Sequence, residues 1–319
     1  MPNARGPITA RLLPALCRRP HDLAFTVDTD DTEDLQLALY CCYELCYQGL
    51  PGVDEQWEWE PSLLSVRRQL EEQFTADLEA EVGIIEVEAD TVPSRLWELA
   101  RPGDGVSLAG WMMKQATLEH FRELAVHRSA YQLKEADPHT WAIPRVSGQA
   151  KATMVAIQAG EYGDGQAAEM HSALFARTMA ALGLDATPNR YLDRIPGVAL
   201  ATTNLISMLG LHRRSRGALV GHLALFEMTS VRPMARYGRA LRRLGLPDWA
   251  CRFYDVHVDA DRAHQEMAVN GMVGGLLDVE PQLAGDVLFG ARALMVVEDR
   301  LTRHLIDRWE KGESSLRQE

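Results

Sequence analysis

Apolar residues recur at helical spacing in segment after segment of this chain, and strand-like alternation is nearly absent. Proline and glycine clusters such as Gly163-Asp-Gly165 separate these segments. The expected helices cover 35–50, 62–82, 93–99, 108–135, 148–161, 169–182, 196–211, 218–244, 247–270 and 281–311. Only 82–87 has the short apolar character of a strand. Successive helices joined by short breaks predict an all-α helical bundle.

The expected domain organisation is simple. Four prolines lie within residues 1–28, which predicts an irregular N-terminal arm. No repeat of 20 to 50 residues and no low-complexity linker divides the rest of the chain. We therefore expect a single helical domain over 29–319, with its chemistry in a core region at about 108–311.

Charge and hydropathy exclude several classes of partner. The formal net charge of −12 disfavours nucleic-acid binding, which needs a clustered basic face. No segment reaches the roughly 18 consecutive apolar residues that span a bilayer, and the N-terminus has no apolar signal core. We expect a cytoplasmic protein without nucleic-acid or membrane partners. The five cysteines lack the paired arms of a zinc site and are interpreted as free thiols, mostly small buried hydrophobes.

One short motif suggests a metal site. His257, Asp261 and His264 stand at i, i+4 and i+7 of an expected helix, which places them on one helix face. Imidazole nitrogens with a carboxylate suit iron, manganese or zinc, and ferrous iron with open positions uses such ligands for dioxygen chemistry. The neighbouring Asp255 and Asp259 are equally compatible with a solvated polar face. The motif alone leaves both interpretations open.

Other segments supply further candidate ligands, namely Glu135, Glu161, His171 and Glu227. Glu227 stands within an apolar run, where a carboxylate needs a partner or a metal because burying it bare is costly. A charge at a helix end is an equally good interpretation of Glu135 and Glu161. For His171, a hydrogen-bonded core histidine is the favoured alternative.

Five separated motifs in order make the sequence similar to the heme-oxygenase-like diiron oxidases and oxygenases, in particular the proteins described as iron-containing redox enzymes. The similarity covers roughly 121–308. Its motifs are His127-Arg-Ser-Ala-Tyr-Gln-Leu-Lys-Glu135-Ala-Asp-Pro-His139, Glu161-Tyr-Gly-Asp-Gly165, Met170-His171-Ser-Ala-Leu-Phe175, His222-Leu-Ala-Leu-Phe-Glu227-Met-Thr229 and His257-x-x-x-Asp261-x-x-His264. The resemblance implies a seven-helix bundle, here with additional N-terminal helices.

The same resemblance implies a ligand set for two Fe(II) ions, made of Glu135, Glu161, His171, Glu227, His257, Asp261 and His264. Some members carry a further glutamate where this chain has Ala168. Classical heme oxygenases are a poorer match, since the context of their N-terminal heme-ligating histidine has no equivalent. The family chemistry is activation of O2 through a peroxo-diferric intermediate, with an external electron donor as a further partner.

The resemblance implies oxidation of a small organic substrate. We expect an amine or amino-acid-like compound of specialised metabolism, changed by N-oxygenation or oxidative C–C cleavage. Oxidative decarboxylation of a fatty acid on the same scaffold is one alternative, and a non-enzymatic metal- or heme-binding helical protein is another. Candidate substrate anchors, for which surface solvation is the alternative, are His212, Arg213, Arg232 and Arg236. Related proteins are often dimers, so a homodimer is expected.

Overall fold

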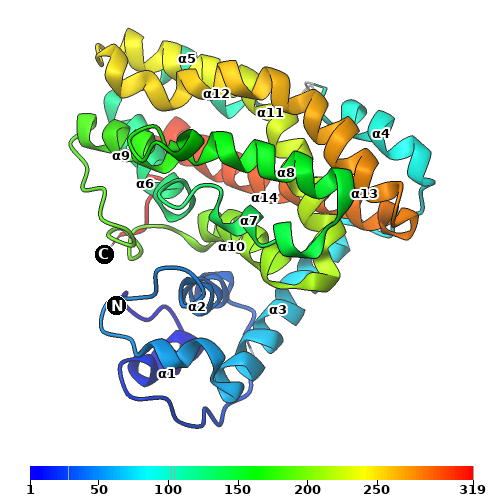
Figure 1. Ribbon diagram of the computed structural model, residues 1–319. Helices are drawn as coiled ribbons and strands as arrows, with labels where there is room; N and C mark the ends of the chain where they lie inside the picture. Colours follow the sequence, from blue (N-terminus) through cyan, green and yellow to red (C-terminus); the bar gives the residue numbers. More distant parts are fainter. Residues whose placement is uncertain (28, 102, 104, 319) are drawn as a thin grey trace.

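The computed structural model describes residues 1–27, 29–101, 103 and 105–318, with the backbone alone at 260–263, and the regular secondary structure of these residues is all helical (Figure 1). No strand occurs within these residues, and 83–88 is irregular. The predicted all-α class is therefore confirmed. None of the described helices combines the length and the apolar character that crossing a bilayer requires.

The α-helices are α1 (Pro7–Leu16), α2 (Thr32–Glu44), α3 (Pro61–Val82), α4 (Val92–Leu99), α5 (Leu108–Gln115), α6 (Leu118–Gln132), α7 (Asp137–Thr140), α8 (Gly148–Glu161), α9 (His171–Ala181), α10 (Gly197–Leu211), α11 (Arg216–Arg243), α12 (Asp248–Glu266), α13 (Gly275–Leu277) and α14 (Ala284–Glu310). Short 3-10 turns are η1 (Glu55–Trp59), η2 (Ala89–Thr91), η3 (Ile143–Arg145), η4 (Gly163–Gly165), η5 (Arg213–Ser215) and η7 (Pro281–Leu283), and η6 (Met267–Gly274) is a π-helix.

The prediction of an irregular arm over 1–28 is wrong, because α1 lies within it. Its first residue is Pro7, and proline is well tolerated in the first turn of a helix. The buried Asp34 carboxylate of α2 accepts hydrogen bonds from the backbone N–H groups of Ile8 at 2.8 Å and Thr9 at 2.9 Å. This cap comes from a distant part of the chain, so no local signal indicates it.

The single helix expected over 108–135 is also wrong, because it is divided into α5 and α6. Thr117 begins α6 with a reciprocal cap, in which its hydroxyl accepts from the backbone N–H of His120. The helix then ends at Gln132, so Glu135 lies in the turn after it. The helix expected over 247–270 continues as α12 to Glu266 and then widens into the π-helix η6.

Helix α11 lies at the centre of the bundle and packs against α5, α10, α12 and α14. Its contact with α14 is unusually close at two glycines. A Cβ atom at Gly221 would overlap the carbonyl of Val287, and one at Gly290 would overlap the carbonyl of Ala218. The two helix backbones therefore touch, which fixes α11 within the core.

We predict that Gly290→Ala lowers the free energy of unfolding by about 3 kcal/mol, because the added methyl group meets backbone that can only yield if two helices separate. Chemical denaturation of the metal-free protein measures this change. Gly274→Ala is the matched control, since the nearest atom to its new methyl group is 3.7 Å away. Equal stability of the two variants would contradict the close packing of α11 on α14.

Candidate metal centre

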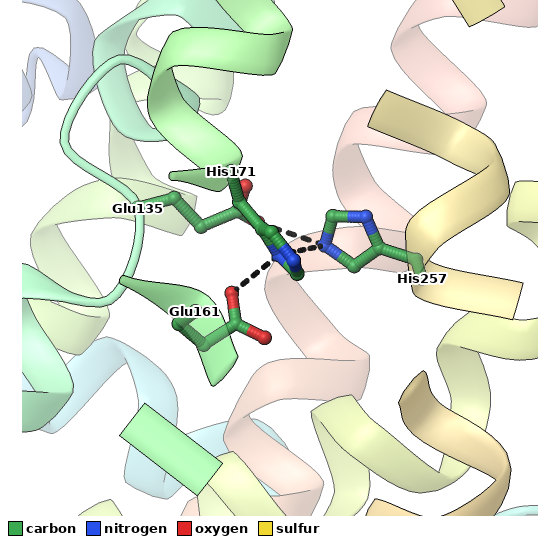
Figure 2. Close-up of side chains that lie close together, drawn as sticks. All are labelled: Glu135, Glu161, His171 and His257. Carbon is green, nitrogen blue, oxygen red and sulfur yellow. Dashed lines mark hydrogen bonds and ion pairs between the residues drawn. The ribbon is translucent and has the colours of Figure 1, made fainter. Parts of the chain in front are cut away.

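Four buried side chains converge between α8, α9, α12 and the turn after α6 (Figure 2). They are Glu135, Glu161, His171 and His257, and each offers one ligand atom within 4.8 Å of the others. His171 Nδ1 lies 2.8 Å from Glu161 Oε2 and 3.1 Å from His257 Nε2. His257 Nε2 lies 3.7 Å from Glu135 Oε1. Two acids and two imidazoles thus face a common point.

A second group of ligand atoms adjoins the first. It consists of Glu161, Glu227 and His264, again within 4.8 Å of one another. His264 Nδ1 and Glu227 Oε2 are 3.2 Å apart. Glu161 belongs to both groups, so its carboxylate lies between two positions that can each hold a cation.

A sharp chain reversal explains why Glu161 meets His171. Glu161 is the last residue of α8, and His171 is the first residue of α9. Between them Gly163 has φ +65°, and a Cβ atom there would approach the backbone of Glu169 and Met170 to 2.6 Å. Only glycine fits this position, which brings the two helix ends together.

The turn that carries Glu135 also has an unusual backbone. Ala136 has φ +77°, a conformation that costs a residue with a side chain of order 1 kcal/mol or more. The Ala136 carbonyl accepts a hydrogen bond of 2.8 Å from Gln158 Nε2 on α8. The strained turn is therefore fastened to the helix that supplies Glu161.

Hydrogen bonding selects the form of His257 that can bind a metal. Its Nδ1 lies 2.7 Å from the carbonyl of Phe253, which accepts the ring proton. The neutral ring then presents an unprotonated Nε2 to the cluster, as in metal-binding histidines generally. Burial opposes ionisation of Glu161, but the hydrogen bond from His171 and the nearby imidazoles lower its pKa overall. Burial raises the pKa of Glu227.

The residues fit a metal ion on structural grounds. Both carboxylate oxygens of Glu135 are buried and have no hydrogen-bond partner in the described part of the chain. A buried carboxylate without hydrogen bonds is costly, and a bound cation removes that cost. Three carboxylates and three imidazoles make a mixed oxygen and nitrogen donor set, which suits iron.

The structure brings together six of the seven predicted ligands. The seventh, Asp261, lies in α12, and its side chain is outside the described residues. The four predicted substrate anchors are not among the described residues that line the cluster's cavity. His212 contacts Glu71 at 2.8 Å, Arg236 donates to the Ser107 hydroxyl, and Arg213 and Arg232 are exposed. As substrate contacts, all four stay a prediction.

A small cavity adjoins the cluster and reveals residues without a predicted role. Its lining residues are Tyr131, Ala136, His139, Gln158, Glu161, Leu223, Phe226, Glu227 and His257. His139 Nε2 lies 3.1 Å from His222 Nδ1, and both rings are buried. Burial lowers the pKa of His222 to about 3 and holds that of His139 well below its usual range. His139 and His222 both lie within the motifs that make this sequence similar to the family. Those motifs were the only sequence feature that pointed to these two histidines.

Comparison with known families agrees with this site. The sequence model of a family described as iron-containing redox enzymes matches residues 122–299, more than half of the chain. The chain belongs to this family. The matched segment of this iron-containing redox enzyme contains both groups of ligand atoms, whereas α1, α2 and α3 lie outside it. The expected membership of the heme-oxygenase-like superfamily is thereby confirmed. A search of curated proteins finds no match.

Acid should destabilise the metal-free protein partly through His222. Its folded pKa of about 3 lies below the value of about 6.5 in an unfolded chain, so the unfolded state binds the proton first. The free energy of unfolding therefore falls as pH decreases from about 6.5 towards 3, by up to about 1.4 kcal/mol per pH unit for this group. We predict that in His222→Gln the free energy of unfolding depends less steeply on pH, by an amount that corresponds to about one proton fewer taken up on unfolding. Urea unfolding across this pH range measures the change. An unchanged slope would show that His222 titrates normally.

The shared position of Glu161 predicts unequal effects of two alanine substitutions. Glu161→Ala removes a ligand from both groups, whereas Glu227→Ala removes one from the second group alone. We expect Glu161→Ala to weaken metal binding at both groups. We expect Glu227→Ala to leave about one tightly bound ion. Anaerobic titration with Fe(II), with bound iron counted after gel filtration, measures the difference. Identical stoichiometry in the two variants would contradict a shared ligand.

Proposed function

We propose that this family member is an O2-dependent oxidase or oxygenase that holds two ferrous ions and oxidises a small organic substrate. The observation that carries the proposal is the presence of two ligand groups with Glu161 in common. A single metal site would need only one of these groups. Membership of the iron-containing redox enzymes supports iron as the metal.

The side chains around the site prepare it for this chemistry. When bound, two ferrous ions supply electrons that reduce dioxygen, and an external donor replaces them. His257 is oriented through its Nδ1 hydrogen bond to the Phe253 carbonyl, so its Nε2 is ready to bind. Leu223 and Phe226 line the cavity and keep water scarce beside the ligands. Burial thus protects a reactive site from solvent.

Gln158 supports a substrate that donates a hydrogen bond. Its Nε2 donates to the Ala136 carbonyl at 2.8 Å and to the Thr140 hydroxyl at 2.6 Å. A carbonyl can only accept, so the amide orientation is fixed. The Oε1 atom is buried without a partner among the described residues, and Gln158 lines the cavity. An amine or amino-acid N–H group that reaches this small cavity would satisfy this oxygen, as a single water molecule would, whereas the chain of a fatty acid would not.

Anaerobic loading with Fe(II) followed by stopped-flow mixing with oxygen tests the proposal. We expect a stoichiometry near two irons and oxygen consumption that a suitable amine accelerates. Amines, amino acids and fatty acids form the substrate panel, and added heme is the control for a heme protein. Failure to bind iron would show that the proposal is wrong. Iron binding without substrate-dependent oxygen consumption by any panel member would indicate a non-enzymatic iron protein.

A further inference from the structure

A buried lysine stands directly beside a ligand of the first group. Lys134 precedes Glu135 in the turn after α6, and it is only 9% exposed. Its ammonium forms an ion pair with Glu44 of α2. The Nζ atom also lies 4.7 Å from the ring centre of Tyr40 and 4.6 Å from that of Tyr47. Two aromatic faces and a carboxylate therefore hold this ammonium in one place.

The partner carboxylate is itself fixed. Glu44 is 3% exposed, and its Oε2 accepts a hydrogen bond of 3.1 Å from Asn189 Nδ2. The side-chain Oδ1 atom of Asn189 accepts in turn from the Tyr40 hydroxyl at 2.7 Å. Asn189 adopts φ +65°, a conformation that asparagine tolerates better than most residues. Hydrogen bonds therefore restrain the Glu44 carboxylate of this ion pair, which would not be so for a flexible surface side chain.

The Glu135 turn is consequently held from two directions. On one side Lys134 is fastened to α2, and on the other the Ala136 carbonyl is fastened to Gln158 of α8. Glu135 stands between these two attachments. Its own carboxylate has no hydrogen bond among the described residues and only a long contact of 3.7 Å with His257 Nε2, so these flanking contacts are the main restraint on its place before metal arrives.

We propose that Glu44 and Lys134 are positioning residues of the metal site, which hold the Glu135 carboxylate on the first group of ligand atoms. The proposal rests on the proposed function in one respect, namely that Glu135 binds a metal. It makes α2, which lies outside the matched residues 122–299, a working part of the metal centre.

Stability alone does not account for this pair. A buried ion pair commonly stabilises a protein no more than apolar residues of similar size, whereas loss of one partner leaves a costly bare charge. Orientation of groups around a metal is a different requirement, and loss of such a supporting contact typically weakens metal binding 10- to 100-fold. The location of Lys134 next to a ligand matches that second requirement.

Three variants separate positioning from folding, namely Glu44→Gln, Lys134→Met and the double variant. Each single variant leaves a buried charge without its partner, so both stability and metal binding should fall. The double variant removes both charges, so its thermal stability should recover towards the wild type. We expect its metal affinity to stay at least about 10-fold below that of the wild type at one of two sites. Anaerobic Co(II) titration, followed by visible absorption, measures each site without catalysis.

Glu298→Gln is the matched control. Glu298 forms a two-pronged ion pair with Arg128 of α6, at 2.6 Å for both contacts, and neither residue belongs to either ligand group. This variant should lose stability but bind two Co(II) ions as the wild type does. A double variant that binds both ions with wild-type affinity would overturn the positioning role. Absence of binding by the wild type itself would instead count against the proposed function, so the two failures are distinguishable.

Discussion

The organisation of this protein depends on the burial of several carboxylates at one point. Glu135, Glu161 and Glu227 are each less than a tenth exposed, and their mutual repulsion in a medium of low dielectric constant opposes folding. The nearby imidazoles offset part of this cost, since they lower the pKa of Glu161. A bound cation would offset more of it. A site of this kind persists only if the surrounding helices are fixed by other means, as α11 is by its close contact with α14.

Three of the candidate ligands lie at or just beyond helix ends and not on the middle of a helix face. Glu161 ends α8, His171 begins α9, and Glu135 follows the end of α6. A side chain at a helix end can be directed by the turn that adjoins it, and here the turns use glycine at Gly163 and a strained alanine at Ala136. The bundle supplies a rigid frame, and its irregular junctions bring the acids to one point. Because the junctions between helices position these acids, unusual backbone conformations occur close to the site.

The sequence predicted the helical class, because helical periodicity is a local property. The family motifs pointed to six residues that the structure brings together, and their role as ligands stays a prediction. The sequence did not predict α1, whose cap is the distant Asp34, nor the break before α6 at Thr117. The partner of Lys134 was equally hidden, since Glu44 lies ninety residues earlier in the chain. The roles of such residues are set by tertiary contacts, and no spacing in a single sequence encodes them.

The spacing of the two histidines on α12 indicates how far apart they lie along the helix, in addition to placing them on the same helix face. Seven residues separate His257 from His264, and at 1.5 Å per residue their backbones are about 10 Å apart along α12. Two imidazoles at that separation reach towards different points, and accordingly His257 belongs to the first ligand group and His264 to the second. Glu161 faces both. Of the three motif residues on α12, the two histidines thus belong to different ligand groups, each of which could hold a cation.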